Sequence, residues 1–116
     1  MMTDAEKQSV LTHQLLMSES TWEKMIELGY TPEKEISLEF FYESPTWRDA
    51  EALRTFLQSE VEYTSVVHAY ADEWKLTGRT QQTKLTLSII KQWIEWMVIA
   101  GFQFNSKFDG WGAEIS

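Results

Sequence analysis

A chain of 116 residues, 43% hydrophobic and 24% charged, predicts one globular domain that spans residues 1–116. Eighteen acidic and ten basic residues give a net charge of −8, which argues against direct nucleic-acid binding and favours a basic protein partner. The lack of cysteine excludes disulfides and agrees with a cytoplasmic location, and no apolar run is long enough for a signal peptide or a membrane span.

The first predicted element is a helix over residues 4–28. Thr3 and Glu6 match a capping box, in which each side chain bonds the other residue's backbone N–H. The apolar stripe is broken, and Ser18-Glu19-Ser20-Thr21 interrupts it, so one bent helix and two shorter helices both fit. Gly29 is a natural helix end.

Residues 35–43 are predicted to form the first strand, because apolar and mixed residues alternate along them. The apolar set is Ile36, Leu38, Phe40 and Tyr42, and the mixed set is Ser37, Glu39, Phe41 and Glu43. This pattern is typical of a sheet that is covered on one side only. Ser44-Pro45 then breaks the strand, and Thr46 is expected to cap a helix that ends near Ser59.

Residues 61–71 and 74–81 are predicted to be the second and third strands, joined by a tight turn at Asp72-Glu73. One face of the second strand would carry Thr64, Val66, His68 and Tyr70. The long polar face of the third strand would carry Lys75, Thr77, Arg79 and Gln81. We expect this polar face, together with Glu39 and Phe41 of the first strand, to be the candidate partner-binding surface.

Residues 82–85 are predicted to be a connection, and Thr86 is expected to cap a strongly apolar helix that reaches Gly101. Trp93 and Trp96 lie three residues apart on this helix, and together with their apolar neighbours they are expected in the core.

The closing strand is predicted over residues 108–115 and contains Phe108-Asp109-Gly110-Trp111-Gly112. Regular alternation would place Asp109, Trp111 and Ala113 on one face. We favour a core position for Trp111, and an exposed interface anchor is the alternative. The two glycines are interpreted as backbone devices, either a bulge or room for a neighbouring ring. The Asp109 carboxylate is expected to accept hydrogen bonds from nearby backbone amides.

The element order is a helix followed by strand–helix–strand–strand–helix–strand. It predicts an α+β fold, a ferredoxin-like two-layer sandwich (βαββαβ) with a four-stranded antiparallel sheet and an extra N-terminal helix. Residues 1–29 would be the N-terminal helical segment and residues 35–116 the ferredoxin-like core. The first and third strands are expected at the centre of the sheet, and the second and fourth at its edges. Both helices of the core would cover one face.

No catalytic, metal or cofactor site is expected. His68 has no positioned partner for acid–base chemistry, and it is too distant from His13 to suggest a metal site. The five glycines form no phosphate-binding loop. We therefore expect a protein that is not an enzyme.

Three stretches resemble the family of regulators of ribonuclease E activity, type B. Phe108-Asp109-Gly110-Trp111-Gly112 is similar to the closing Asp-Gly-Trp-Gly signature of that family, in which an aromatic residue usually precedes the Asp. Ile36-Ser37-Leu38-Glu39-Phe40-Phe41-Tyr42 resembles its first strand, and Trp74 opens the third strand in a similar way. The resemblance covers roughly residues 22–115.

The resemblance implies a ferredoxin-like fold and a protein-binding regulator without a cofactor. The type member is small and acidic, and it continues into a strongly acidic tail, whereas the sequence here ends at Ser116. It binds ribonuclease E outside the catalytic domain, in the basic scaffold region, and so restrains messenger RNA decay. An adaptor or a toxin-neutralising, immunity-type domain on the same fold is the alternative. The oligomeric state is left open.

Overall fold

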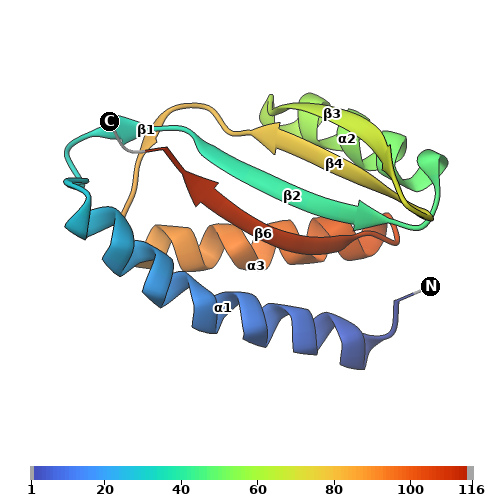
Figure 1. The fold of residues 1–116 in the computed structure, drawn as a ribbon, viewed down its shortest axis with the longest axis horizontal. Coiled ribbons are helices and arrows are strands. Elements are labelled where there is room, and N and C mark those ends of the chain that lie inside the picture. Colours follow the sequence, from blue (N-terminus) through green and yellow to red (C-terminus); the bar gives the residue numbers. More distant parts are fainter. Residues whose placement is uncertain (1, 115–116) are drawn as a thin grey trace.

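The computed structural model describes residues 2–114, which form three helices and six strands arranged in two antiparallel sheets (Figure 1). The helices are α1 (Asp4–Glu27), α2 (Trp47–Val61) and α3 (Leu87–Gln103). The strands are β1 (Glu35–Ile36), β2 (Leu38–Ser44), β3 (Thr64–Tyr70), β4 (Glu73–Arg79), β5 (Thr83–Lys84) and β6 (Lys107–Ala113).

The larger sheet has the strand order β3-β4-β2-β6, with every neighbouring pair antiparallel. The first and third long strands, β2 and β4, therefore lie at the centre, and β3 and β6 are the edges. This order confirms the arrangement that the sequence predicted. It follows from the two strand–helix–strand units, each of which returns its second strand to the same sheet.

The two-stranded sheet of β1 and β5 differs from the prediction, because the sequence pattern favours one strand over residues 35–43 and a connection over residues 82–85. The break falls at Ser37, whose hydroxyl donates to the Thr80 carbonyl oxygen at 2.6 Å. The Leu38 amide donates to Thr80 Oγ1 at 2.9 Å. These side-chain bonds hold the chain where β1 turns away from β2 to pair with β5.

The core lies between the larger sheet and the helices. Leu38, Phe40 and Tyr42 of β2 are 0–1% exposed, so the apolar face predicted for this strand is confirmed. They pack in one cluster with buried residues of α2 and α3, including Leu53, Leu57, Ile90, Ile94 and Met97. The Tyr42 hydroxyl donates to the Met97 carbonyl oxygen at 2.6 Å, which satisfies the one polar group on a fully buried ring.

The N-terminal helix α1 is a single element of 24 residues, which decides between the two alternatives left by the sequence. The capping box of Thr3 and Glu6 is present as predicted. Ser18, in the interrupted stretch, is fully buried and donates to the Leu15 carbonyl oxygen at 2.6 Å, so the helix continues through it.

α1 lies beside α3 and also meets β6, so it extends the helical layer (Figure 1). Lys91 of α3 and Glu19 of α1 form an ion pair at 2.7 Å between the two helices. The other face of the larger sheet therefore has no helix of residues 2–114 over it. No helix in this part of the chain is long and apolar enough to cross a membrane.

Several predicted boundaries shift. α2 continues through Val61 and ends at Glu62 in the left-handed conformation (φ 58°), so β3 begins at Thr64 and not at residue 61. Tyr70 pairs with Glu73, which places the hairpin turn at Ala71-Asp72, with φ 54° at Ala71. The predicted caps Thr46 and Thr86 both accept a hydrogen bond from the backbone N–H three residues on.

The two tryptophans of α3 have different surroundings. Trp93 is partly buried and packs against the core. Trp96 is 38% exposed and stacks on Phe56 of α2 with an angle of 17° between the rings, so its predicted core position is wrong. A helix turns 100° per residue, and an offset of three residues is enough to carry Trp96 to the rim of the apolar stripe.

Candidate functional site

The candidate site is the face of the larger sheet that lies opposite the helices, called the open face below. Antiparallel register sets side chains from distant parts of the sequence next to one another. Three cross-strand rows run from β3 through β4 to β2: Thr64, Arg79 and Glu39; Val66, Thr77 and Phe41; and His68, Lys75 and Glu43. The open face also carries Tyr70 of β3, Glu73 of β4, and Lys107 and Asp109 of β6. Glu39, Phe41, Lys75, Thr77 and Arg79, which the sequence predicted to lie together, do so.

Lys75 is the centre of a charge cluster on the open face. Its Nζ atom lies 2.5 Å from Glu43 Oε1, 3.9 Å from Asp109 Oδ2 and 5.1 Å from the centre of the Tyr70 ring. The hydrogen bond to Glu43 is the main cause that raises the pKa of Lys75; burial opposes it, and the charges of Glu43, Asp109 and Glu73 add to the rise. Lys75 therefore remains protonated at neutral pH between two carboxylates.

A second ion pair joins β4 and β2. Arg79 Nη2 donates to Glu39 Oε1 at 2.7 Å, and the two side chains are 53% and 31% exposed. Exposed pairs of this kind contribute about 0–1 kcal/mol to stability. A partner that offers its own charges can therefore replace this pair at small cost to the fold.

An apolar strip separates the two ion pairs. Phe41 and Thr77 are half-buried between their neighbours, whereas Val66 and Tyr70 of β3 are each 63% exposed. Large exposed apolar side chains beside charged groups are the composition of many recognition surfaces. The sequence placed Val66 and Tyr70 on one face of their strand but did not assign them to the site. Two large apolar side chains in that otherwise polar set were the feature that could have found them.

The closing strand β6 contains a bulge that reverses part of the prediction. Phe108 pairs with Tyr42 and Gly110 with Phe41, so Asp109 is an extra residue in β6. Gly110 has φ 151°, a conformation that suits glycine. Asp109 and Trp111 therefore lie on opposite faces of the sheet, and their predicted common face is wrong.

Trp111 is directed to the helical layer, as the favoured prediction stated. It is partly buried and packs against the core. Phe108 is also on this side and is 1% exposed. The predicted bulge is present at Gly110. At Gly112 an added Cβ would contact nothing within 4 Å, so this glycine is not needed to make room for a neighbouring ring. The Asp109 carboxylate lies near Lys75 instead of near the backbone amides expected.

Gln81 does not belong to the open face, and its prediction is corrected. β4 ends at Arg79, and the chain then turns toward β5. The Gln81 side-chain amide donates to the Glu62 carbonyl oxygen at 2.9 Å and so connects this turn to the end of α2. The alternation of polar residues continued past the strand end, and the pattern alone could not show where pairing stops.

A metal site and an apolar ligand-binding groove are the two other kinds of site that this fold could offer. Within residues 2–114 no three His, Cys, Asp or Glu side chains gather in a way that could hold a metal ion. On the helical side, an apolar groove of about 380 Å³ is lined by Leu38, Tyr63, Leu85, Trp93 and five further residues. This groove has few polar groups to orient a ligand, so the open face remains the stronger candidate.

Comparison with known proteins identifies a protein family. The family model described as regulator of ribonuclease activity B matches residues 15–113, which is most of the chain. A search of curated proteins finds no match. The matched segment begins within α1 and ends with β6, so it includes every strand of the open face.

Proposed function

Because the chain belongs to the family of regulators of ribonuclease activity B, we propose that it is a non-enzymatic protein-binding regulator that inhibits ribonuclease E and so modulates messenger RNA decay. The proposed partner is the basic scaffold region of ribonuclease E, and the proposed location is the cytoplasm. The strand order β3-β4-β2-β6 supports a ferredoxin-like core, to which α1 and the small β1–β5 sheet are additions.

The observation that carries this proposal is the uncovered open face. Sheets of this size usually bury one face and expose the other, but the exposed face is then mostly polar. Here Val66, Tyr70 and the half-buried Phe41 lie among ion pairs. We propose that Glu39, Phe41, Lys75, Thr77 and Arg79, together with Val66 and Tyr70, contact the partner.

Charge supports a basic partner at this surface. The open face carries four carboxylates, those of Glu39, Glu43, Glu73 and Asp109, against the three cations Lys75, Arg79 and Lys107. The whole chain has a net charge of −8, so a basic segment is attracted over a longer range as well. Added salt weakens this attraction, because the screening length falls below about 10 Å as the ionic strength rises.

Affinity capture tests the proposal. The immobilised chain is mixed with the scaffold region of ribonuclease E, and with its catalytic domain as a control, at low and at moderate salt. We expect capture of the scaffold region alone, with less captured as salt rises. Failure to capture it at low salt would contradict the ribonuclease E proposal, and the alternative adaptor or immunity-type function would then become the stronger candidate.

A matched pair of variants tests the surface. Glu39→Gln removes a carboxylate from the open face, and Glu23→Gln removes an exposed carboxylate from α1. Both change the net charge equally. We expect only Glu39→Gln to reduce capture, and an equal reduction by both variants would show that only overall charge matters.

A further inference from the structure

The edge strand β3 lacks the features that usually protect the edge of a sheet. Its seven residues, Thr-Ser-Val-Val-His-Ala-Tyr, include no proline and no lysine, arginine or acidic residue. Natural edges are normally blocked by charges, proline, bulges or a covering element. Among residues 2–114, β3 pairs with β4 only, and its register of seven consecutive pairs has no shift.

The opposite edge, β6, is protected by comparison. It carries the bulge at Asp109-Gly110, and α1 lies against it on the helical side. A bulge twists the outer backbone away from the position that a further strand would need. The two edges of the same sheet therefore differ, and β3 alone presents a regular row of backbone groups.

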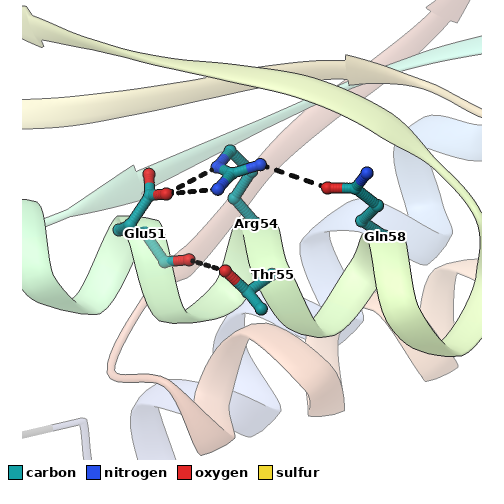
Figure 2. A network of polar contacts seen from close by, with 4 residues as sticks. All are labelled: Glu51, Arg54, Thr55 and Gln58. Atoms are coloured by element: carbon teal, nitrogen blue, oxygen red, sulfur yellow. Dashed lines mark hydrogen bonds and ion pairs between the residues drawn. The ribbon is translucent and has the colours of Figure 1, made fainter.

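The helical side of the β3 edge is polar. α2 lies over β3, and its Phe56 packs toward Trp96 of α3 and toward Phe104, the residue that follows α3. The side of α2 turned away from α3 carries Glu51, Arg54 and Gln58, which are joined by hydrogen bonds through the Arg54 guanidinium (Figure 2). The hydrogen bond from Arg54 lowers the pKa of Glu51, so this pair stays charged.

Acidic residues stand at both ends of β3. Glu60 and Glu62 precede it, Asp72 and Glu73 follow it, and all four are exposed. Residues 55–74 contain no lysine or arginine. A neutral strand between two acidic ends therefore carries a charge pattern of its own, separate from the ion pairs of the open face.

This pattern decides between two possible occupants of the edge. In a symmetric antiparallel pairing with a second copy, the Glu60 and Glu62 end of one chain would meet the Asp72 and Glu73 end of the other. Like charges opposed across a strand pair are destabilising. An extended segment with lysine or arginine on both flanks meets opposite charges at each end.

We propose that β3 accepts an extended segment of a partner protein as a fifth strand, with β-branched or aromatic residues at its centre and basic residues on both flanks. Backbone hydrogen bonds along β3 supply affinity, as in other cases of strand addition. Side chains on one face of the added strand contact Val66 and Tyr70. Side chains on its other face are directed toward Glu51, Arg54 and Gln58 of α2. The inference goes beyond the proposed function because it concerns the sheet edge and does not require ribonuclease E.

The test uses a synthetic peptide in which valine and threonine alternate between two flanking lysines at each end. It is titrated into the isotope-labelled full chain, and backbone amide signals are followed by NMR. We expect shifts and slower hydrogen exchange concentrated in β3, with β6 unchanged. A matched peptide with glutamates in place of the lysines should bind at least about tenfold more weakly.

A pair of variants tests the charge argument without altering the core. Glu60→Lys with Asp72→Lys cancels the net charge at both ends of β3, because Glu62 and Glu73 remain, and should abolish the preference between the two peptides. Glu23→Lys with Glu27→Lys makes the same charge change on exposed positions of α1 and should leave the preference intact.

Three results would overturn the proposal: shifts that fall outside β3, equal binding of the two peptides, or no binding at millimolar peptide. Concentration-dependent protection of β3 without peptide, together with a dimer in sedimentation, would assign the edge to a second copy instead. None of these results depends on ribonuclease E, so failure here is distinguishable from failure of the proposed function.

Discussion

Trp93 of α3 and Trp111 of β6 meet edge to face, with ring centres 6.3 Å apart and planes at 87°. Trp93 also meets the Phe108 ring at 6.0 Å and donates through its indole N–H to the Tyr63 hydroxyl at 3.1 Å. One side chain of the helix therefore joins the closing strand to the segment that precedes β3. The tryptophan of the closing motif has a structural role on this side of the sheet.

Replacing Trp111 by alanine should destabilise the chain by about 2 kcal/mol, because a half-buried ring and its aromatic contact are lost. Chemical denaturation measures the change. Trp47→Ala is the control, since Trp47 is 54% exposed and its loss should change stability by no more than about 0.5 kcal/mol. Equal losses of stability in the two variants would contradict the anchoring role of Trp111.

The two glycines of the closing motif should respond differently to substitution. Gly110→Ala forces a side chain into φ 151° and should cost about 1–3 kcal/mol. Gly112→Ala meets open space without a positive φ and should change stability by less than about 0.5 kcal/mol. Thermal melts of both variants measure the difference. A tolerant Gly110 would mean that the bulge is not fixed by its backbone conformation.

The overall arrangement could be predicted because local patterns and chain order agreed. Alternation along β2, the helix caps Thr3, Thr46 and Thr86, and the strand order all follow from residue chemistry and handedness. Five of the six residues predicted for the partner surface lie on the open face for the same reason. A period of two fixes which side chains share a face once the strand is placed.

The failures in the sheets share one physical cause, which is that strand ends and bulges depend on partners distant in sequence. The extra residue Asp109 is defined by the pairing of its neighbours, Phe108 with Tyr42 and Gly110 with Phe41. The break at Ser37 depends on Thr80. Gln81 continued the polar alternation but lies beyond the last paired residue of β4. Sequence patterns show which residues suit a strand and do not show where its neighbour stops.

Tyr42 should make stability depend on pH in the alkaline range. Burial is the main cause that raises the pKa of its hydroxyl well above the ordinary 10.0, so the folded state keeps the proton. Above about pH 10 the unfolded chain releases this proton first, and stability therefore falls as pH rises. Below that pH both states hold the proton, and the group adds no pH dependence.

Tyr42→Phe should lower stability at neutral pH by about 1 kcal/mol, because the hydrogen bond to the Met97 carbonyl is lost. Above pH 10 the variant should lose stability less steeply than the parent. A remaining slope is expected from Tyr63, whose pKa is also raised by burial. Urea denaturation at pH 7 and pH 11 measures both effects, and parallel pH profiles would contradict the assignment.

The Arg79–Glu39 pair should contribute little to folding. A double-mutant cycle with Arg79→Ala and Glu39→Ala should give a coupling of no more than about 1 kcal/mol, because both side chains are partly exposed. Raising the salt concentration should reduce it further. A coupling several times larger would show that the pair stabilises the sheet and is not free to exchange partners.

The central claim is that the open face binds the basic scaffold region of ribonuclease E, and calorimetric titration tests it most directly. The parent chain, Phe41→Thr with Glu39→Gln, and Trp47→Ala with Glu23→Gln are each titrated with that region. The second double variant removes an exposed aromatic residue and a carboxylate outside the open face. Circular-dichroism melts confirm that all three are folded. We predict at least about tenfold weaker binding for the open-face variant alone, and equal affinity of all three would contradict the claim.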